Sequence, residues 1–404
     1  MGGGPRWAAA IGAAALALAV LLQGPAVAAP ALSPAAPTPQ CAPAAKQTVP
    51  DLPWPQARLE LERVWAVTRG AGQIVAVIDS GVDASVPQLQ GYVLRGADVI
   101  GNSGRGDTDC VGHGTFVAGI IAAQPKGALR FVGVAPEAKI LPIRQTTDGR
   151  DGSANSMAKA IVTAVDAGAH VINISANSTG PSKALKEAVA YAVSKNVLIV
   201  AAVGNQNRDE GPGGPAYPAS YPDVLGVAAV GRDDQPASFS RQGGFVDIAA
   251  PGVDIISLGR AGPGYVLDQG TSFAAPFVAG AAALVRAYRP ELTVRQIIRR
   301  LQSTADQPAT TVPDPQVGWG IVNPFKAVTA IVPGERPTDR DGAGGDPEKP
   351  VTAITPATVP PGDGATSAAG EQSDSRVPLI IGIGVVVALF ALGVIAARSV
   401  TRRR

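Results

Sequence analysis

The chain has 404 residues, and the 46% that are hydrophobic suffice for a substantial core in one large or two ordinary domains. Its 34 basic and 32 acidic residues leave a net charge of +2, which gives no reason to expect a nucleic-acid partner. The chain contains two histidines and two cysteines, so few side chains compete for the role of catalytic base or disulfide partner.

Residues 1–28 have the pattern of a secretory signal peptide. Arg6 precedes the apolar stretch 8–22, and Ala26-Val27-Ala28 offers a cleavage site of small residues. A first membrane anchor is the alternative, but the apolar core is short for one. We therefore expect the chain to be exported.

Residues 29–58 are rich in Pro and Ala and have little periodicity, which indicates an extended N-terminal arm. Cys41 lies in this arm, and Cys110 is the other cysteine. In an exported protein the pair predicts one disulfide, with two free buried thiols as the alternative. The bond would hold the arm beside His113, three residues after Cys110.

Residues 59–330 alternate short apolar runs with helical stretches and form the predicted catalytic domain. We expect strands at 74–78, 139–143, 171–175, 197–202 and 224–230, and helices at 115–123, 153–167, 182–194, 271–288 and 294–303. Strands that are apolar throughout, separated by helices, predict an α/β fold with a parallel sheet covered on both faces. In such sheets, functional sites lie beyond the carboxyl ends of the strands.

The C-terminal part predicts a tether. Residues 331–376 are rich in Pro and Gly and indicate a disordered linker, and residues 377–397 carry no charge and are long enough to span a bilayer. The tail, 398–404, is rich in Arg, which favours a cytoplasmic C-terminus. The sequence thus predicts a single-pass protein of the cell membrane with an extracytoplasmic catalytic domain.

A candidate nucleophile lies where a glycine turn enters an apolar helix. Gly270-Thr271-Ser272 places the Ser272 hydroxyl at the helix N-terminus, where the dipole favours negative charge. The alternative is a serine that merely caps a core helix. Asp79, at the end of an apolar run, and His113, between two glycines, precede it in the order Asp, His, Ser, which builds catalytic triads in one protease class.

Two further residues bear on the expected catalytic chemistry: a candidate oxyanion donor and the second histidine of the chain. Asn205 follows Gly204 at the end of an apolar strand and is a candidate oxyanion donor, or else a turn residue. His170 begins a buried strand and is expected to be structural. His113 is therefore the expected base, and Asp79 would hold its useful tautomer.

Four segments, around Asp79, His113, Asn205 and Ser272, resemble the signatures of subtilisin-like serine proteases, and the resemblance covers residues 59–328. It implies a three-layer α/β fold, with a central parallel sheet and helices on both faces. It also implies a serine endopeptidase that cleaves protein or peptide substrates without a cofactor.

Within that family the architecture resembles the mycosins, membrane-anchored proteases of actinobacterial type VII secretion systems. The supporting features are the two chain ends, the arm, the linker and the run Asp107-Thr108-Asp109-Cys110 before His113. The resemblance implies an arm that wraps the catalytic domain and a secretion membrane complex as partner. The alternatives are a mainly structural subunit with limited proteolysis and an inactive protease-like binding module.

Two departures from the family pattern concern specificity and metal binding. Many subtilisins have Ser-Leu-Gly-Gly in the substrate cleft where this chain has Ser175, Ala176, Asn177 and Ser178. We expect these residues to narrow the cleft and favour a small residue before the scissile bond. Gln88 stands where many relatives have a calcium-ligating Asp, so no metal site is expected.

Overall fold

The computed structural model describes residues 1–2, 41–48, 51–101, 103–126, 130–147, 153–178, 180–206, 214–307 and 311–335. The predicted signal peptide beyond its second residue, the predicted membrane span and the basic tail lie outside these residues. Among the helices that are described, none has the length and apolar character needed to cross a membrane.

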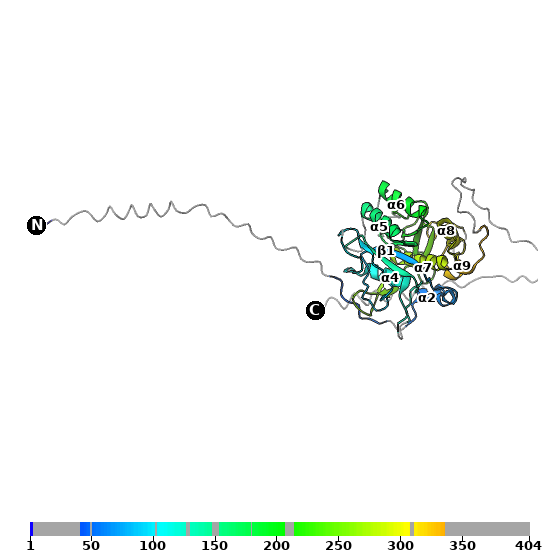
Figure 1. Cartoon of the computed structure of the whole chain (residues 1–404), viewed down its shortest axis with the longest axis horizontal. Coiled ribbons are helices and arrows are strands. Elements are labelled where there is room, and N and C mark those ends of the chain that lie inside the picture. Colours follow the sequence, from blue (N-terminus) through cyan, green and yellow to red (C-terminus); the bar gives the residue numbers. More distant parts are fainter. Residues whose placement is uncertain are drawn as a thin grey trace, which may run out of the picture. The chain divides into compact units, whose positions relative to one another are not determined.

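The centre of the fold is a seven-stranded sheet in which every paired strand is parallel (Figure 1). The strands, in the spatial order β2-β3-β1-β4-β5-β6-β7, are β2 (Ala97–Asp98), β3 (Lys139–Arg144), β1 (Ile74–Asp79), β4 (Val171–Ile174), β5 (Leu198–Ala202), β6 (Val224–Val230) and β7 (Ile248–Pro251). All five predicted strands are present within one residue of their expected bounds. The short strands β2 and β7 were not predicted from the sequence.

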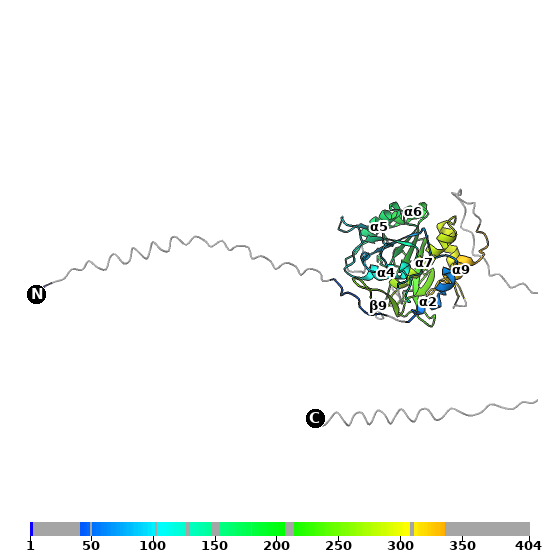
Figure 2. The same cartoon turned by 60° about the horizontal axis from the view of Figure 1, so that its bottom comes forward.

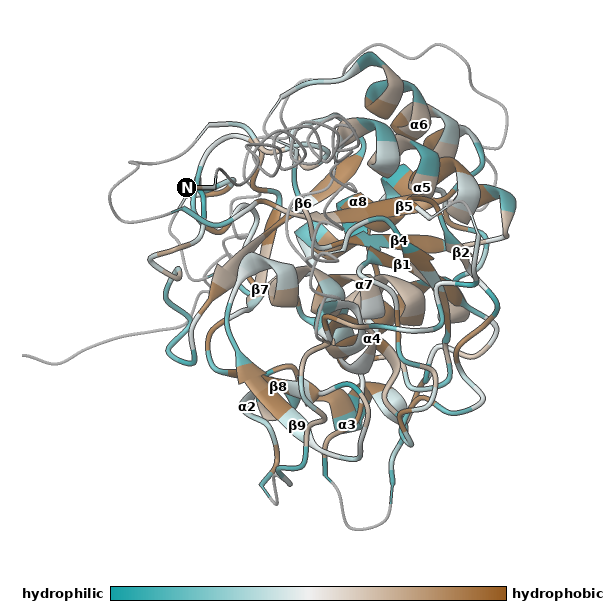
Figure 3. Cartoon of the chain, turned by 90° about the vertical axis from the view of Figure 1, so that its left-hand side faces the viewer, coloured by the Kyte–Doolittle hydropathy of each residue, from teal (hydrophilic) through white to brown (hydrophobic). Residues whose placement is uncertain are grey.

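Helices cover both faces of the sheet, as the apolar strands predict. On one face lie α4 (His113–Ala122), α7 (Thr271–Tyr288), α8 (Val294–Ser303) and α9 (Pro324–Thr329), and on the other lie α5 (Ala154–Asp166) and α6 (Lys183–Ser194) (Figures 1 and 2). Successive residues of β1 alternate between the layers: Val75 and Val77 pack on the α4–α7 side, and Ala76 and Ile78 on the α5–α6 side. In Figure 3 the sheet strands are mostly brown, whereas teal appears on the outer helices α5 and α6.

The arm is docked on a hairpin that the sequence analysis did not predict. The hairpin pairs β8 (Ile255–Leu258) with β9 (Tyr265–Asp268) in antiparallel fashion, outside the main sheet. The arm residue Gln47 accepts a hydrogen bond from the backbone N–H of Tyr265, 2.8 Å away. Cys41 and Cys110 are joined by the predicted disulfide, so both ends of the segment 41–47 are attached to the body.

The boundaries of the predicted arm and linker need correction. Trp54–Arg58 form helix α2, although an extended arm was expected up to residue 58. Leu61–Trp65 form the next helix, α3, in the expected catalytic domain. The indole N–H of Trp54 donates to the Val253 carbonyl, 3.1 Å away, and this anchors α2 to the body. At the other end, Glu335 pairs with the buried Arg300, so the first residues of the predicted linker belong to the body. A buried guanidinium requires such a partner, which pattern analysis of the linker could not reveal.

Candidate active site

Asp79 and His113 meet at the carboxyl end of the sheet. Asp79 is the last residue of β1, and His113 is the first residue of α4, which begins two residues earlier than predicted. His113 Nδ1 lies 2.8 Å from Asp79 Oδ1 and 2.9 Å from Oδ2. Because the carboxylate accepts the Nδ1 proton, the neutral imidazole leaves Nε2 free to act as a base.

Asp109 organises the turn that holds His113, and the sequence analysis gave it no such role. Its buried carboxylate accepts five hydrogen bonds, from Ser80 Oγ (3.0 Å), Val111 N (3.0 Å), Gly112 N (2.8 Å), Thr115 N (2.9 Å) and Thr115 Oγ1 (2.7 Å). Four of these donors lie in the turn around His113. The available signal was an acidic residue just before a predicted helix, which is typical of a capping side chain.

The charged groups around His113 stabilise its protonated imidazole more strongly than water does. Burial would lower the pKa of His113, but the negative charge and hydrogen bond of Asp79, with the charges of Asp109 and Asp268, outweigh it. The pKa of His113 is therefore raised above its usual 6.5. The same carboxylates would stabilise the imidazolium that forms when His113 takes up a proton.

The side chains of Ser272 and Asn205 both lie close to Gly270, at the start of α7. Asn205 follows β5, and its Oδ1 accepts hydrogen bonds from the backbone N–H and the hydroxyl of Thr271, both 3.0 Å long. A Cβ placed on Gly270 would lie 3.1 Å from Ser272 Oγ and 3.3 Å from Asn205 Nδ2. Gly270 has a φ of 155° and a ψ of 160°, a conformation that is almost restricted to glycine. The space between hydroxyl and amide therefore stays open.

The turn that carries Ser272 lies against the imidazole. The ring of Phe273 has its centroid 5.2 Å from that of His113. Within the described residues the Ser272 hydroxyl makes no hydrogen bond to His113. In free enzymes this contact is often long and tightens when substrate binds. The candidate nucleophile Ser272, the candidate base His113 and the candidate oxyanion donor Asn205 thus lie near the carboxyl ends of β1 and β5.

Comparison with known proteins agrees with this geometry. The model of the Subtilase family matches residues 70–320. The chain belongs to the subtilase family. It is 42% identical over 312 residues to Mycosin-4 of Mycobacterium tuberculosis (strain ATCC 25618 / H37Rv). The aligned residues make up 67% of this chain and 68% of that protein.

Two solved structures extend the comparison to three dimensions. The MycP3 protease from the type VII (ESX-3) secretion system is 38% identical, with a TM-score of 0.64 over 72% of this chain and 93% of that one. A chain of the periplasmic assembly from the ESX-5 inner membrane complex is 33% identical, with a TM-score of 0.65 over 81% of this chain and 94% of that one. The protein is therefore a mycosin-like serine endopeptidase of the subtilase family.

The expected cleft residues of this subtilase are more buried than the sequence suggests. Ser175 and Ala176 are each 5% exposed, and only Asn177 of the three is half-exposed. Ser175 Oγ donates to the Ser272 carbonyl, 2.7 Å away, and accepts from the Asn173 amide at 2.9 Å. Ser175 therefore supports the turn that carries Ser272, because its strand ends directly beneath α7.

The side chains of Gln88 and His170 form hydrogen bonds to other groups of the protein. The Gln88 amide donates to the Gln124 carbonyl at 2.7 Å and to the Phe131 carbonyl at 3.0 Å, and its oxygen accepts from the Tyr265 hydroxyl at 2.6 Å. These neutral bonds use the polar atoms that an ion would need, so the site does not fit calcium. His170 Nδ1 accepts from the Ile74 N–H at 3.0 Å, which agrees with the structural role expected for it.

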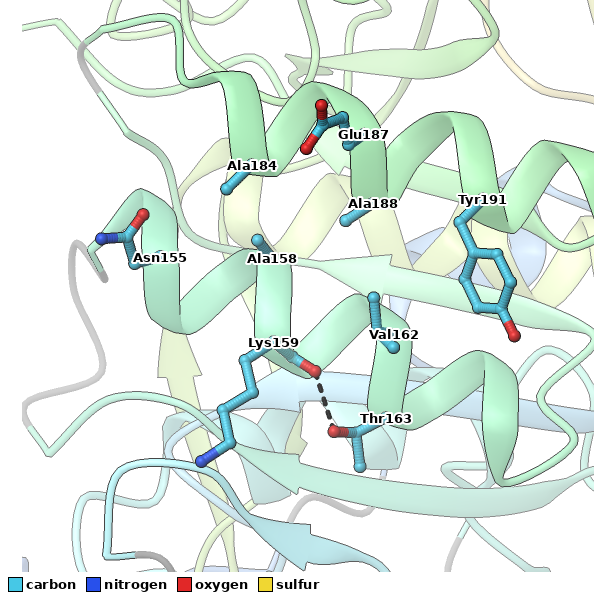
Figure 4. A pocket seen from close by; sticks show the side chains of 9 residues that line it. All are labelled: Asn155, Ala158, Lys159, Val162, Thr163, Ala184, Glu187, Ala188 and Tyr191. Atoms are coloured by element: carbon cyan, nitrogen blue, oxygen red, sulfur yellow. Dashed lines mark hydrogen bonds between the residues drawn. The ribbon is translucent and has the colours of Figure 1, made fainter.

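A second pocket of about 520 Å³ lies between α5 and α6 on the other face of the sheet (Figure 4). Its charged side chains are Lys159 and Glu187, and the rest of its wall includes Ala158, Val162 and Tyr191. No histidine, serine or cysteine lines it. It therefore lacks the combination of Asp, His and Ser found at the candidate site.

Proposed function

We propose that Ser272 is the nucleophile of this serine endopeptidase, that His113 is its general base and then its acid, and that Asp79 orients His113. The contact of 2.8 Å between Asp79 and His113 Nδ1, at the turn that carries Ser272, is the observation that supports this assignment most strongly. The resemblance of the surrounding segments to the family signatures supports it independently.

The proposed reaction follows from these positions. His113 Nε2 takes the proton of the Ser272 hydroxyl as Oγ attacks the substrate carbonyl. The amide of Asn205 and the backbone N–H of Ser272, in the first turn of α7, donate to the developing oxyanion. His113 then gives its proton to the leaving amine, and water releases the acyl group by the same steps in reverse.

A single substitution tests the nucleophile. Ser272→Ala should abolish labelling by a fluorophosphonate probe and hydrolysis of peptides, while the thermal unfolding of the protein stays unchanged. Ser194→Ala is the matched control, because Ser194 is exposed at the end of α6 and lies in neither the triad nor the cleft. Retained labelling of the Ser272→Ala protein would show that another residue is the nucleophile.

We infer further that the enzyme works outside the cell, held by residues 377–397 in the membrane, in association with a type VII secretion membrane complex. The support is the pattern of the chain ends and the similarity to MycP3 and to a chain of the ESX-5 assembly. Protease added to intact cells should degrade the body and spare the Arg-rich tail. Degradation of the tail and protection of the body would reverse the proposed orientation.

A second candidate function is a mainly structural role in such a complex, with limited or regulatory proteolysis. The similarity to a component of a membrane assembly favours it, and it is compatible with an active triad. Comparison of the proteins secreted by wild-type and Ser272→Ala cells separates the two functions. Lost processing with intact secretion would indicate the structural role, whereas lost secretion would make the proteolysis itself essential.

A further inference from the structure

Asn205, the proposed oxyanion donor, lies three residues beyond the end of β5 and is exposed. An oxyanion donor stabilises the transition state only if its N–H is already in place when the charge develops. Thr271 holds the side-chain oxygen of Asn205, but this contact alone does not fix the backbone from which the side chain projects. The backbone of residue 205 therefore needs a restraint of its own.

An isolated antiparallel bridge supplies part of this restraint. Asn205 lies opposite Ser240, and beside the pair the Arg241 N–H donates to the Gly204 carbonyl at 3.1 Å. Residues paired in this way lie between the hydrogen bonds of their neighbours and make none to each other. The bridge therefore leaves the carbonyl of Asn205 available to another donor.

The side chain of Arg241 is that donor. Its Nε donates to the Asn205 carbonyl at 3.2 Å, and its Nη1 donates to the Gly214 carbonyl at 3.4 Å. In the part of the chain that the structure describes, no other group donates to the Asn205 carbonyl. Two acceptors on a planar guanidinium fix its orientation. Asn205 is thus held at both ends, by Arg241 at its carbonyl and by Thr271 at its side chain.

Gly204 allows the half-buried side chain of Arg241 to lie this close. It has a φ of 91°, in the left-handed region that favours glycine. A Cβ at this position would lie 3.3 Å from both Cδ and Nε of Arg241, and 3.1 Å from Asn177 Nδ2. The methylene stem of Arg241 therefore packs against the residue that precedes Asn205, and this packing restrains the side chain.

We propose that Arg241 is a positioning residue for the oxyanion donor: its Nε holds the Asn205 carbonyl and thereby keeps the Asn205 amide directed at the oxyanion. The proposal rests on the assignment of Ser272 and Asn205 under the proposed function. Because Arg241 acts through Asn205, its effect should appear in kcat and should require the Asn205 side chain.

Two variants of similar side-chain length test the hydrogen bond itself. Arg241→Met keeps the stem but has no donor, whereas Arg241→Gln places an amide N–H at the position of Nε without the charge. We expect Arg241→Met to lower kcat about 10-fold with little change in KM, since a displaced donor loses mainly transition-state stabilisation. Arg241→Gln should keep kcat within about 3-fold of the wild-type value, because the bond is retained. Arg299→Met, at an exposed position of α8, is the control and should change neither constant.

A double-mutant cycle tests whether Arg241 acts through Asn205. In the Asn205→Ala background, Arg241→Met should not lower kcat further, because the group that Arg241 positions is absent. An inhibitor gives a second measurement. A peptide trifluoromethyl ketone forms a tetrahedral oxyanion adduct with the nucleophile, so its Ki should rise in Arg241→Met by the same factor by which kcat/KM falls.

The value of kcat is expressed per Ser272 that reacts with a fluorophosphonate probe, so that unfolded protein does not lower it. Equal kcat values for the wild-type and Arg241→Met proteins would overturn the proposal. An equal loss in Arg241→Met and Arg241→Gln, or a loss that persists in the Asn205→Ala background, would also overturn it. Failure of the proposed catalytic assignment is recognised separately, because Ser272 of the wild-type protein would then not be labelled.

Discussion

The side-chain oxygen of Asn205 accepts two hydrogen bonds from Thr271, one from its backbone N–H and one from its hydroxyl. Because the oxygen is occupied, the amide nitrogen is left as the donor near Ser272. This arrangement attaches the proposed oxyanion donor to the same turn that carries the proposed nucleophile. The two groups therefore cannot shift independently.

Asn205→Ala is expected to lower kcat by about two to three orders of magnitude with little change in KM, since the lost bond forms only in the transition state. Steady-state kinetics on one peptide substrate measures this. Thr271→Val removes one of the two bonds that orient Asn205 and should lower kcat by only about 10-fold. A raised KM with an unchanged kcat for Asn205→Ala would show instead that the amide binds the substrate equally in its ground state.

The pH dependence of kcat/KM should report the raised pKa of His113. The base must be neutral, so activity should be lost as pH falls through this pKa, with a midpoint above the usual 6.5. Since the Asp268 charge contributes to the rise, Asp268→Asn should move the midpoint to lower pH, and Asp233→Asn should leave it in place. A wild-type midpoint below 6.5 would contradict the electrostatic description.

Removal of the disulfide with Cys41→Ser and Cys110→Ser should destabilise the protein by about 4 kcal/mol, because the bond closes a loop of 69 residues. Chemical unfolding under two-state conditions measures the change. The arm should also become sensitive to proteolysis. Peptide mapping without reductant should recover the two cysteines linked, and two alkylatable thiols in the mature protein would refute the bond.

The stability of the protein should depend on Asp247, which lies just before β7. Burial raises the pKa of Asp247 from 3.8 to about 6, although its carboxylate accepts the Gly226 N–H at 2.8 Å. The folded state therefore binds this proton more tightly than the unfolded state, so this group's contribution to stability is full below pH 3.8 and declines as pH rises to about 6.

Asp247→Asn should accordingly stabilise the protein at pH 8, by up to about 3 kcal/mol at about 1.4 kcal/mol per pKa unit. The gain should become small near pH 4, where the wild-type carboxyl is protonated in the folded state and nearly half protonated in the unfolded state. Urea unfolding at both pH values tests this, with Asp233→Asn as the exposed control. A stabilisation that is equal at both pH values would assign the effect to something other than ionisation.

Much of the fold follows from local pattern. Helix α7 has the predicted bounds, Thr271–Tyr288, because a long run of small apolar residues after Gly270 can only be a buried helix. The strand β6 also has its predicted bounds. The hairpin β8–β9 escaped prediction because its strands have four residues each and lie among glycines, so no apolar period distinguishes them.

The candidate site was predictable only in part. Asp79, His113 and Asn205 follow from strand ends, glycine turns and family signatures. Asp109 lies in the run before His113, but the sequence did not predict its hydrogen bonds to the turn that holds His113. Asp268 stands in no recognised segment and could not be assigned to the site. Ser175 was expected to contact substrate, but the packing of β4 beneath α7 turns its hydroxyl toward the Ser272 carbonyl instead.

By itself, the sequence determined the layered α/β architecture, the disulfide partners and the candidates for the reacting groups, since apolar periodicity and residue chemistry are local properties of the chain. The tertiary structure decided which segments surround those groups: Pro43, His113 and Asp268 line one pocket although long stretches of chain separate them. Such neighbours are chosen by the packing of whole elements, which depends on contacts between distant residues and leaves no trace in any single segment.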